Sequence, residues 1–379
     1  MRAVVLARAG DPVSVEQLEL DPPGAGQVRV RMLASGVCHS DLHVRDGDWD
    51  RPGPIVMGHE GAGIVEALGP GVDPVASGLQ PGQLVALSWV VPCGACRSCR
   101  AGRSWECQDS PSFGHGRDAD GNTRLRRADG SEILAYLSIG TMAEAQVVPA
   151  GAAIPMPDGT PPEVAALIGC CVATGVGAVV KTAAVPAGAS VAVIGLGGVG
   201  LSVIMGARLA GAGQVVAIDR VAAKLELARE LGATDAILAG SDPAATADAL
   251  RAITGGGPDF AFEAIGRPAT AELAIDVLPP GGTAVLVGMT AQGQRAGFDV
   301  YRFVDGGRRI LGSNYGSAVA AVDFPRYAAL HLEGRLPVDR LIERRIDLDG
   351  VEDAFERLRR GEGLRSVIAF LGLAVWAWH

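Results

Sequence analysis

The segment Val191-Ala-Val-Ile194, followed by Gly195-Leu-Gly197-Gly198-Val-Gly200, decides the fold. A short apolar strand leads directly into a glycine-rich turn, and residues 201–209 have helical spacing. In such a turn the first glycine makes the bend, the second lets the backbone approach a pyrophosphate, and the third permits close packing of helix and strand. The N–H groups and dipole of the following helix favour an anion. The sequence therefore predicts a dinucleotide site at this turn.

An acidic residue follows at the distance expected for contact with a ribose. Asp219 ends the next apolar segment, about 20 residues after the turn. Its carboxylate suits a ribose with two free hydroxyls and would repel a 2′-phosphate, so the sequence favours NAD over NADP. The neighbouring Arg220 could partly offset that repulsion, and we expect it to lie exposed beside the adenine.

Strands and helical segments alternate around this motif, which predicts a doubly wound parallel sheet. The expected strands are 191–194, 215–218, 236–238, 260–263, 284–287 and 310–311. The expected helices are 201–209, 222–231 and 269–278. Residues 1–36 instead alternate apolar and polar side chains, as antiparallel strands do. We expect an α/β protein with a β-rich domain (1–171 and 315–379) and a six-stranded Rossmann domain (172–314).

The composition argues against several classes of protein. A chain of 379 residues can form two cores, and its net charge of −9 argues against nucleic acid and anionic membranes as partners. The apolar stretch at the N-terminus is too short for a secretory signal. The apolar run 367–378 is shorter than the about 20 residues that are needed to span a membrane. We expect a cytoplasmic protein, with no role assigned to the tail after Phe370. The polar stretch 111–130 is expected to be a long surface loop.

Four of the seven cysteines lie close together, at Cys93, Cys96, Cys99 and Cys107. Thiols stay reduced in the cytosol, so patterned cysteines there are metal ligands more often than disulfides. Four thiolates at the spacing CxxCxxCx7C can surround one tetrahedral zinc ion, and such a closed site is structural. Free thiols and an iron–sulfur cluster are the alternatives, but the surrounding chain supplies no second redox centre. We predict a structural zinc site.

Three further stretches carry residues of metal-ligand type: Gly36-Val-Cys38-His39-Ser40-Asp41-Leu42-His43, Gly58-His59-Glu60 and Gly169-Cys170-Cys171. Spacing alone does not link them. Together with the four-cysteine loop, GLGGVG and Leu364-Arg365-Ser366-Val367, they follow an order that resembles the zinc-containing medium-chain alcohol dehydrogenases from end to end. The resemblance implies a GroES-like catalytic domain, a Rossmann domain and zinc-dependent oxidation of an alcohol with NAD.

The resemblance also implies a catalytic zinc ion held by Cys38, His59 and Cys170, with one position open to water or substrate. Glu60 is implied as an acid that can approach the metal, and Asp41 as a carboxylate that orients His59. The second cysteine of the Cys170-Cys171 doublet departs from the family, which often has glycine there. We expect it to be a small buried residue.

Other roles follow from the same resemblance. Ser40 and His43 would relay the alcohol proton towards solvent, and Trp49 and Trp89 would lie near the substrate channel. We expect a primary alcohol, with aromatic and allylic alcohols as candidates. The family implies a homodimer or homotetramer, with the edge strand 310–311 as a candidate interface. The remaining implied cofactor contacts are His39, Thr174, Val199, Lys224, Val287 and Arg365.

Two other functions remain open. The phrases Asp323-Phe-Pro-Arg-Tyr327 and Gly334-Arg-Leu-Pro337 resemble mycothiol-dependent formaldehyde dehydrogenases, which oxidise the hydroxymethyl adduct of a small thiol. Formaldehyde oxidation that requires added thiol would favour this alternative. A non-catalytic NAD(H)-binding sensor is the other alternative, and one zinc ion per chain with no NADH formed from alcohols would favour it.

Overall fold

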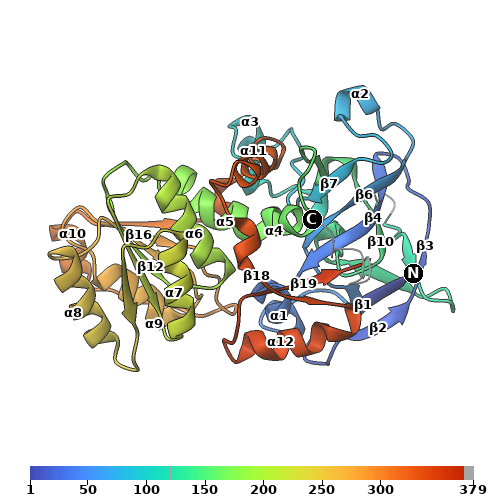
Figure 1. Cartoon of the computed structure of the whole chain (residues 1–379). Coiled ribbons are helices and arrows are strands. Elements are labelled where there is room, and N and C mark those ends of the chain that lie inside the picture. The colour runs from blue at the N-terminus through green and yellow to red at the C-terminus, as the bar shows by residue number, and fades with distance from the viewer. Residues whose placement is uncertain (119–120, 371–379) are drawn as a thin grey trace. The chain divides into compact units, whose positions relative to one another are not determined.

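Two compact units make up the chain. The computed structural model describes residues 1–118 and 121–370, so the tail after Phe370 lies outside the described residues. The split unit combines residues 1–170 with 319–379, and the inserted unit is residues 171–318. The expected α/β class is confirmed, because the inserted unit holds a parallel sheet with helices and the split unit is rich in antiparallel strands (Figure 1).

The inserted unit is built on a six-stranded parallel sheet in the order β14-β13-β12-β15-β16-β17. Its strands are β12 (Ser190–Ile194), β13 (Gln214–Asp219), β14 (Asp235–Leu238), β15 (Phe260–Glu263), β16 (Thr283–Leu286) and β17 (Arg309–Gly312). Its helices are α5 (Ala173–Gly177), α6 (Gly198–Ala210), α7 (Ala222–Leu231), α8 (Pro243–Thr254), α9 (Pro268–Asp276) and α10 (Val300–Asp305). Each strand expected from the sequence is present in this sheet.

The strand order of this sheet reverses between β12 and β15, and a doubly wound sheet binds its ligand at such a point. The central strand β12 is a continuous apolar run because it is covered on both faces, and Val191, Ala192 and Val193 are fully buried. Helix α6 packs on α7, and α8 packs on α9. The glycine turn at the end of β12 therefore lies where a dinucleotide is expected.

The split unit contains two mostly antiparallel sheets, in the orders β2-β1-β5-β9-β8-β3 and β11-β7-β6-β4-β19-β18, with β10 also paired to β4. Along β4, Val28, Val30 and Met32 are buried, while Arg29 and Arg31 pair with Glu66, so the expected alternation is confirmed. The strands are β1 (Arg2–Leu6), β2 (Ser14–Gln17), β3 (Glu19–Leu20), β4 (Gln27–Gly36), β5 (Ile55–Val56), β6 (Glu60–Leu68), β7 (Leu84–Leu87), β8 (Leu125–Arg126), β9 (Glu132–Ala135), β10 (Ala145–Pro149), β11 (Ala153–Pro155), β18 (Ile342–Ile346) and β19 (Arg365–Ala369).

Helices of the split unit hold the segments that carry the candidate site. They are α1 (His39–Asp46), α2 (Pro74–Ser77), α3 (Arg97–Arg100), α4 (Pro162–Leu167), α11 (Ala320–Leu332) and α12 (Val351–Arg359). Helix α4 packs against β4, β6 and β7. Helix α1 is tied to α12 by ion pairs of Arg45 with Glu352 and of Asp46 with Arg359. These contacts hold the C-terminal end of α1 against α12 and hold α4 against the sheet.

Helix α4 continues through a π-helical turn (Ile168–Val172) into α5, and a second π-helical turn (Ala178–Thr182) ends the run. The whole run, Pro162–Thr182, is apolar and long enough to cross a membrane, but 89% of its apolar window is buried, which is the pattern of a core helix. Shorter 3-10 turns occupy Ser104–Glu106, Pro111–Gly114, Tyr136–Ser138, Ala150–Ala152, Tyr315–Ser317, Val338–Leu341 and Leu348–Gly350.

Two sequence-based expectations about secondary structure were incomplete. The stretch 111–130 is not wholly a surface loop, because it contains β8, whose Leu125 is buried and pairs with Ile133. One buried leucine among polar residues gives no periodic signal, so the strand was missed. Helix α8 was also missed; its buried residues are few, and its start depends on Asp242, which caps the backbone N–H of Ala244 at 2.9 Å.

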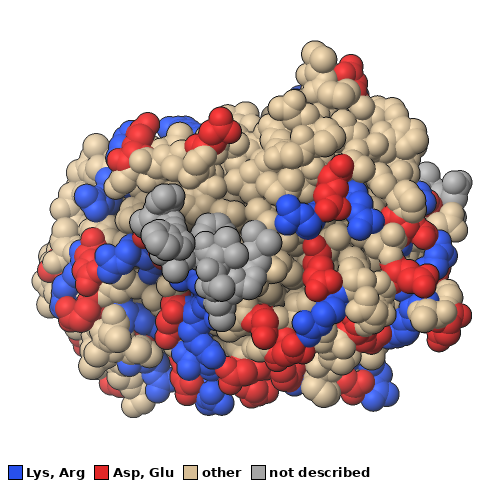
Figure 2. Space-filling model, turned by 45° about the vertical axis from the view of Figure 1, so that its right-hand side comes forward, with Lys and Arg blue, Asp and Glu red and all other residues tan. Residues whose placement is uncertain are grey.

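Charged side chains of both signs are interspersed on the face shown in Figure 2. Many of the charges in the described residues are paired, as in Arg8 with Asp11 and Arg335 with Glu333. Exposed pairs of this kind contribute little, about 0–1 kcal/mol each. The stability of the two units therefore depends mainly on their buried apolar cores.

Candidate metal centres and dinucleotide site

Four residues from distant parts of the sequence meet inside the split unit: Cys38, His59, Glu60 and Cys170. Their ligand atoms lie within 4.8 Å of one another, and all four residues are buried. Cys38 precedes α1, His59 and Glu60 stand at the start of β6, and Cys170 lies in the π-helical turn after α4. We call this group the buried cluster.

Glycines next to these residues allow the close approach. Gly58, just before His59, has φ of +94°, a left-handed conformation that side chains rarely adopt. A Cβ at Gly36 would overlap the carboxylate of Glu60, and a Cβ at Gly169 would lie 2.9 Å from the carbonyl oxygen of Leu87. The glycines in the three sequence stretches are therefore required by the packing of the buried cluster.

Asp41 connects two parts of the buried cluster. Its Oδ1 lies 3.0 Å from His59 Nδ1, and its Oδ2 accepts a hydrogen bond of 3.2 Å from the backbone N–H of Cys38. A carboxylate partner keeps a proton on Nδ1, so Nε2 of His59 is the nitrogen that can bind a metal. Nε2 is buried and has no hydrogen-bond partner, which fits a metal ligand. The expectation that Asp41 orients His59 agrees with this geometry.

The charges around His59 and Cys38 favour a cation. Burial opposes protonation of His59, but Asp41 and Cys38 outweigh it and hold the pKa of His59 well above its usual range. A hydrogen bond from Cys170 lowers the pKa of the Cys38 thiol well below its usual range, against the effect of burial. Two sulfurs and an imidazole nitrogen are donors that zinc prefers, so the buried cluster fits a zinc ion.

Arg365 is a charged neighbour of Glu60 in the buried cluster. Its guanidinium is buried, pairs with the Glu60 carboxylate and donates a hydrogen bond of 3.0 Å to the carbonyl oxygen of Val37. Burial raises the pKa of Glu60 to about 8, although Arg365 favours the charged form. The resemblance had implied that Arg365 contacts the cofactor; in this structure Arg365 pairs with Glu60, and the cofactor contact stays a prediction.

The four cysteines at residues 93–107 form a second group, which we call the loop cluster. Their sulfurs lie within 4.8 Å of one another. Cys96 Sγ and Cys107 Sγ are 4.0 Å apart, close to the about 3.8 Å between sulfurs of a tetrahedral zinc site. Backbone N–H groups of Cys93, Cys96 and Cys99 donate to sulfurs of the same cluster. The loop cluster therefore fits a structural zinc ion.

Two thiols of the loop cluster differ in environment. Backbone N–H groups of Ala95 and Cys96 lower the pKa of Cys93 to about 7, whereas burial raises the pKa of Cys107 to about 12. Four thiolates this close repel one another unless a cation lies between them. The fold thus brings the four thiols together, and a bound cation would offset the repulsion between their thiolate charges.

The glycine turn of the inserted unit leaves room for a phosphate. Gly195 has φ of +94°, and a Cβ at Gly200 would overlap the carbonyl oxygen of Gly195. A Cβ at Gly197, the residue that precedes α6, would meet nothing within 4 Å, and no side chain caps the first N–H groups of that helix. Asp219 Oδ2 accepts a hydrogen bond of 2.7 Å from the Leu196 N–H and so ties the turn to the end of β13.

The other residues expected to contact the cofactor lie in three places. Helix α5, which carries Thr174, packs on α6, because a Cβ at Gly175 would overlap the carbonyl oxygen of Val199. Val287 follows β16, and its backbone N–H donates a hydrogen bond of 2.9 Å to the backbone carbonyl oxygen of Glu263. Exposed or half-buried surface positions hold His39, Arg220 and Lys224.

The residues of the expected relay lie on α1, where Ser40 and His43 are three residues apart and so share one face. The His43 imidazole is stacked on the buried ring of Trp49, with ring centroids 4.7 Å apart. Trp89 is partly buried against the core of the split unit. Their proximity to a substrate stays a prediction.

Sequence reasoning missed two aromatic residues beside the buried cluster. The rings of Tyr136 and His59 are perpendicular with centroids 5.7 Å apart, and the ring of His115 is stacked on that of Tyr136 at 6.3 Å. Burial lowers the pKa of His115 to about 4. Both residues lie in turns with left-handed backbone at His115 and Leu137, and no periodic pattern marks them in the sequence.

Comparison with known proteins bears on both units. Residues 24–158 match the family profile "Alcohol dehydrogenase GroES-like domain", and residues 198–332 match "Zinc-binding dehydrogenase". An NDMA-dependent alcohol dehydrogenase from Amycolatopsis methanolica is 36% identical over 375 residues, which cover 97% of this chain and 98% of the relative.

Solved structures agree. An alcohol dehydrogenase zinc-binding domain protein from Burkholderia ambifaria is 39% identical with a TM-score of 0.90, covering 97% of this chain and 98% of the other. A benzyl alcohol dehydrogenase from Acinetobacter calcoaceticus is 32% identical with a TM-score of 0.89 and the same coverage. Of two further structures, at 27% and 29% identity, one holds NAD and the other NADP. The chain therefore belongs to the zinc-containing medium-chain alcohol dehydrogenase family, and zinc and a nicotinamide dinucleotide are its cofactors.

Proposed function

We propose that this chain oxidises a primary alcohol, aromatic and allylic alcohols included, by hydride transfer to NAD, and that it can catalyse the reverse reduction. The observation that carries the proposal is the unpaired, buried Nε2 of His59 in a cluster with two cysteine sulfurs. A structural histidine in a core would have satisfied both ring nitrogens. This one is oriented by Asp41 and left open on the side of Cys38 and Cys170.

Each residue has a definite task in this proposal. Cys38, His59 and Cys170 hold the catalytic zinc, which supplies Lewis acidity that makes an alcohol hydroxyl far more acidic. Asp41 keeps His59 in the tautomer that binds metal. Glu60 is the fourth residue of the buried cluster, an acid that can approach the metal, and its pairing with Arg365 holds it there. Ser40 and His43 carry the released proton towards solvent.

We propose the loop cluster as a second, structural zinc site. Cys93, Cys96, Cys99 and Cys107 supply four ligands, so no position is left for a substrate. The absence of an open position distinguishes this site from the buried cluster, where the protein supplies three ligands and the nearby carboxylate of Glu60. Zinc analysis of the purified protein is therefore expected to give two ions per chain.

Asp219 supports NAD rather than NADP as the redox partner. Its two oxygens accept hydrogen bonds from the backbone N–H groups of Leu196 and Val221, and this fixes the carboxylate at the end of β13. A 2′-phosphate would bring like charge to that carboxylate. The exposed Arg220 alone does not remove this repulsion. We expect Asp219→Ser to narrow the preference for NAD, measured as the ratio of kcat/KM for the two cofactors.

An aromatic or allylic alcohol is supported by one relative and by the indole rings. The similar protein from Acinetobacter calcoaceticus is a benzyl alcohol dehydrogenase. The resemblance implies that Trp49 and Trp89 lie near the substrate channel, where their rings would narrow the channel or stack on an aromatic alcohol. We therefore expect benzyl and cinnamyl alcohol to have a higher kcat/KM than ethanol.

One panel of assays tests the proposal. Alcohols and aldehydes of increasing size are assayed with NAD and NADP, each with and without a low-molecular-weight thiol, next to zinc analysis. Turnover of simple alcohols without thiol supports the proposal. Activity confined to formaldehyde plus thiol would support a thiol-adduct formaldehyde dehydrogenase instead. One zinc ion per chain with no turnover at all would support a sensor.

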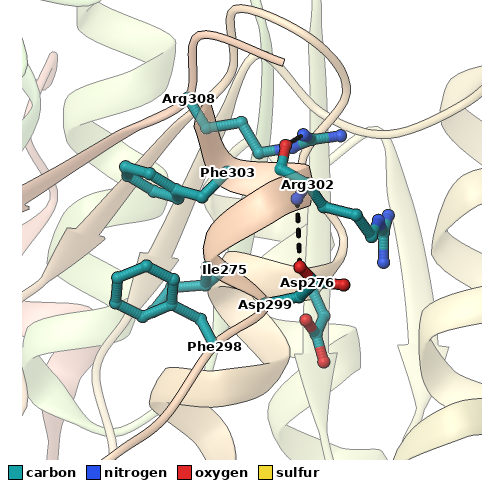
Figure 3. A pocket seen from close by; sticks show the side chains of 7 residues that line it. All are labelled: Ile275, Asp276, Phe298, Asp299, Arg302, Phe303 and Arg308. Atoms are coloured by element: carbon teal, nitrogen blue, oxygen red, sulfur yellow. Dashed lines mark hydrogen bonds between the residues drawn. The ribbon is translucent and has the colours of Figure 1, made fainter. Parts of the chain in front are cut away.

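We further propose that two copies of the chain associate through the inserted unit, as a homodimer or within a homotetramer. Strand β17 is the last in its sheet, and Val300, Tyr301 and Val304 on the adjacent α10 are exposed. Figure 3 shows Phe298 and Phe303 of the same segment beside Ile275, with the Arg302 N–H bonded to Asp299. A paired edge strand and a covered apolar helix would remove both features from solvent.

Light scattering tests the association. The wild-type protein is expected to have a mass of at least two chains, and Tyr301→Glu with Val304→Glu is expected to give monomers. A monomeric wild-type protein would contradict the proposal.

A further inference from the structure

The chain folds back on itself directly after α1. Gly47 ends the helix with φ of +81°, which glycine adopts without strain. The backbone N–H groups of Asp48 and Trp49 then donate to the carbonyl oxygen of His43, at 2.9 Å and 3.3 Å. These bonds place Asp48 and Trp49 next to the side chain of His43.

This turn surrounds the imidazole of His43 with three groups. Asp48 Oδ2 lies 2.7 Å from Nδ1. The ring of Trp49 lies almost parallel to the imidazole, with an interplanar angle of 23°. The ring of His39, one turn earlier on α1, is tilted against it at 5.9 Å. The contact with Asp48 gives Nδ1 a hydrogen-bond partner, and the stacking on Trp49 fixes the orientation of the ring plane.

We propose that Asp48 is a positioning residue for the proton relay, which keeps His43 in the tautomer with hydrogen on Nδ1 and a lone pair on Nε2. The inference rests on the proposed function, in which His43 receives the proton of the alcohol. A neutral imidazole has one donor and one acceptor nitrogen, and a carboxylate can only accept. The hydrogen therefore stays on Nδ1, and Nε2 is the only nitrogen that can take a proton.

The proton balance is simple. In the proposed relay, Ser40 gains a proton from the alcohol side and passes one on, so it is unchanged, while His43 gains a proton on Nε2 and becomes an imidazolium. The Nδ1–H bond to Asp48 is kept throughout, and the carboxylate offsets the new positive charge. Water then removes the proton from Nε2, and the ring returns to the starting tautomer.

A purely structural role for Asp48 makes a different prediction. The helix end is already closed by Gly47 and by backbone bonds to the carbonyl oxygen of His43. The Asp48 side chain is 41% exposed, so its bond to His43 contributes little to the free energy of unfolding. Loss of the carboxylate should therefore alter the tautomer and the rate while the fold stays intact.

The test compares Asp48→Ala and Asp48→Asn with the matched control Asp50→Asn, an exposed acid on the same turn. Histidine rings are labelled with ¹⁵N, and the His43 signals are assigned by their loss in His43→Gln. The wild-type protein and Asp48→Asn, whose amide oxygen still accepts from Nδ1–H, should show hydrogen on Nδ1. Asp48→Ala should show hydrogen on Nε2 or a mixture.

Kinetics supply the second readout. Asp48→Ala should lower kcat by about 10-fold to 100-fold with little change in KM, as expected for a defect in proton transfer. Asp48→Asn should recover most of that loss, and Asp50→Asn should behave as the wild type. An unchanged tautomer in Asp48→Ala, or equal changes in kcat, KM and thermal stability, would overturn the proposal. If the wild-type chain oxidises no alcohol, the proposed function fails, while the tautomer still decides whether Asp48 positions His43.

Discussion

The loop cluster draws its four thiols from residues 93–107, whereas the buried cluster draws its ligands from residues as far apart as Cys38 and Cys170. In the loop cluster, backbone N–H groups of the same loop donate to the sulfurs. In the buried cluster, β6, α1 and the turn after α4 each bring one ligand or two to a place already enclosed by the core.

The difference separates two uses of one metal. A loop with few buried apolar residues gains order from the ion that joins its ligands, so metal binding there is part of folding. A cluster fixed by sheet and helices is formed by the core, so the ion adds chemistry and comparatively little stability. Substitutions in the two clusters should therefore have different consequences.

Cys38→Ser should have the largest effect, because it removes a ligand of the buried cluster. Turnover is expected to fall by more than the ~10–100-fold that loss of an outer partner costs, with one zinc ion lost and NADH affinity retained. Cys171→Ala, a substitution of the neighbouring buried thiol outside the cluster, is the matched control. Equal losses of turnover and NADH binding would indicate a folding defect and remove support for the assignment.

Cys99→Ser should act mainly on stability. We expect loss of one zinc ion and a decrease in Tm of roughly 5–10 °C, with turnover per folded molecule largely kept. Scanning calorimetry and assays on the same preparation test this. If turnover disappears while Tm is unchanged, the two clusters do not divide their roles as described.

Asp41→Asn should have an intermediate effect on the buried cluster. An uncharged amide has only one accepting oxygen, so it cannot accept from both His59 Nδ1 and the Cys38 N–H, and zinc affinity and kcat are expected to fall about 10-fold to 100-fold. Zinc competition with a chelator and steady-state kinetics provide the measurement. Asp73→Asn, a change at the exposed cap of α2, should leave both unchanged.

His115→Gln should have the smallest effect and tests whether the stack next to His59 matters. Burial lowers the pKa of His115 to about 4, below the value of about 6.5 in an unfolded chain. As pH falls from about 6.5 to about 4, the unfolded chain binds a proton that the folded chain does not, so the stability of the wild type should decrease. Urea unfolding across this range should show a weaker pH dependence in the variant.

The sequence predicted the features that depend on neighbouring residues, but not the sites that form only when distant segments meet in the fold. The glycine turn, Asp219 and the loop cluster are short-range patterns, and each has a physical reason for its spacing. The meeting of Cys38, His59 and Cys170 followed only from resemblance, because three strands and helices far apart in sequence create it. Leu125, Tyr136 and His115 were missed, since single buried residues in turns carry no period. Asp48 was missed because its role depends on the left-handed turn at Gly47.

The strand β19 lies between β4 and β18, and its Arg365 meets Glu60 across 305 residues of chain. The sheet of the split unit is thus closed only after the whole inserted unit has been synthesised. An inserted unit that has folded acts as a short connector, whereas an unfolded one is a long loop whose closure costs more entropy. Substitutions that slow folding of residues 171–318 should therefore delay completion of the buried cluster, while the loop cluster forms without waiting for them.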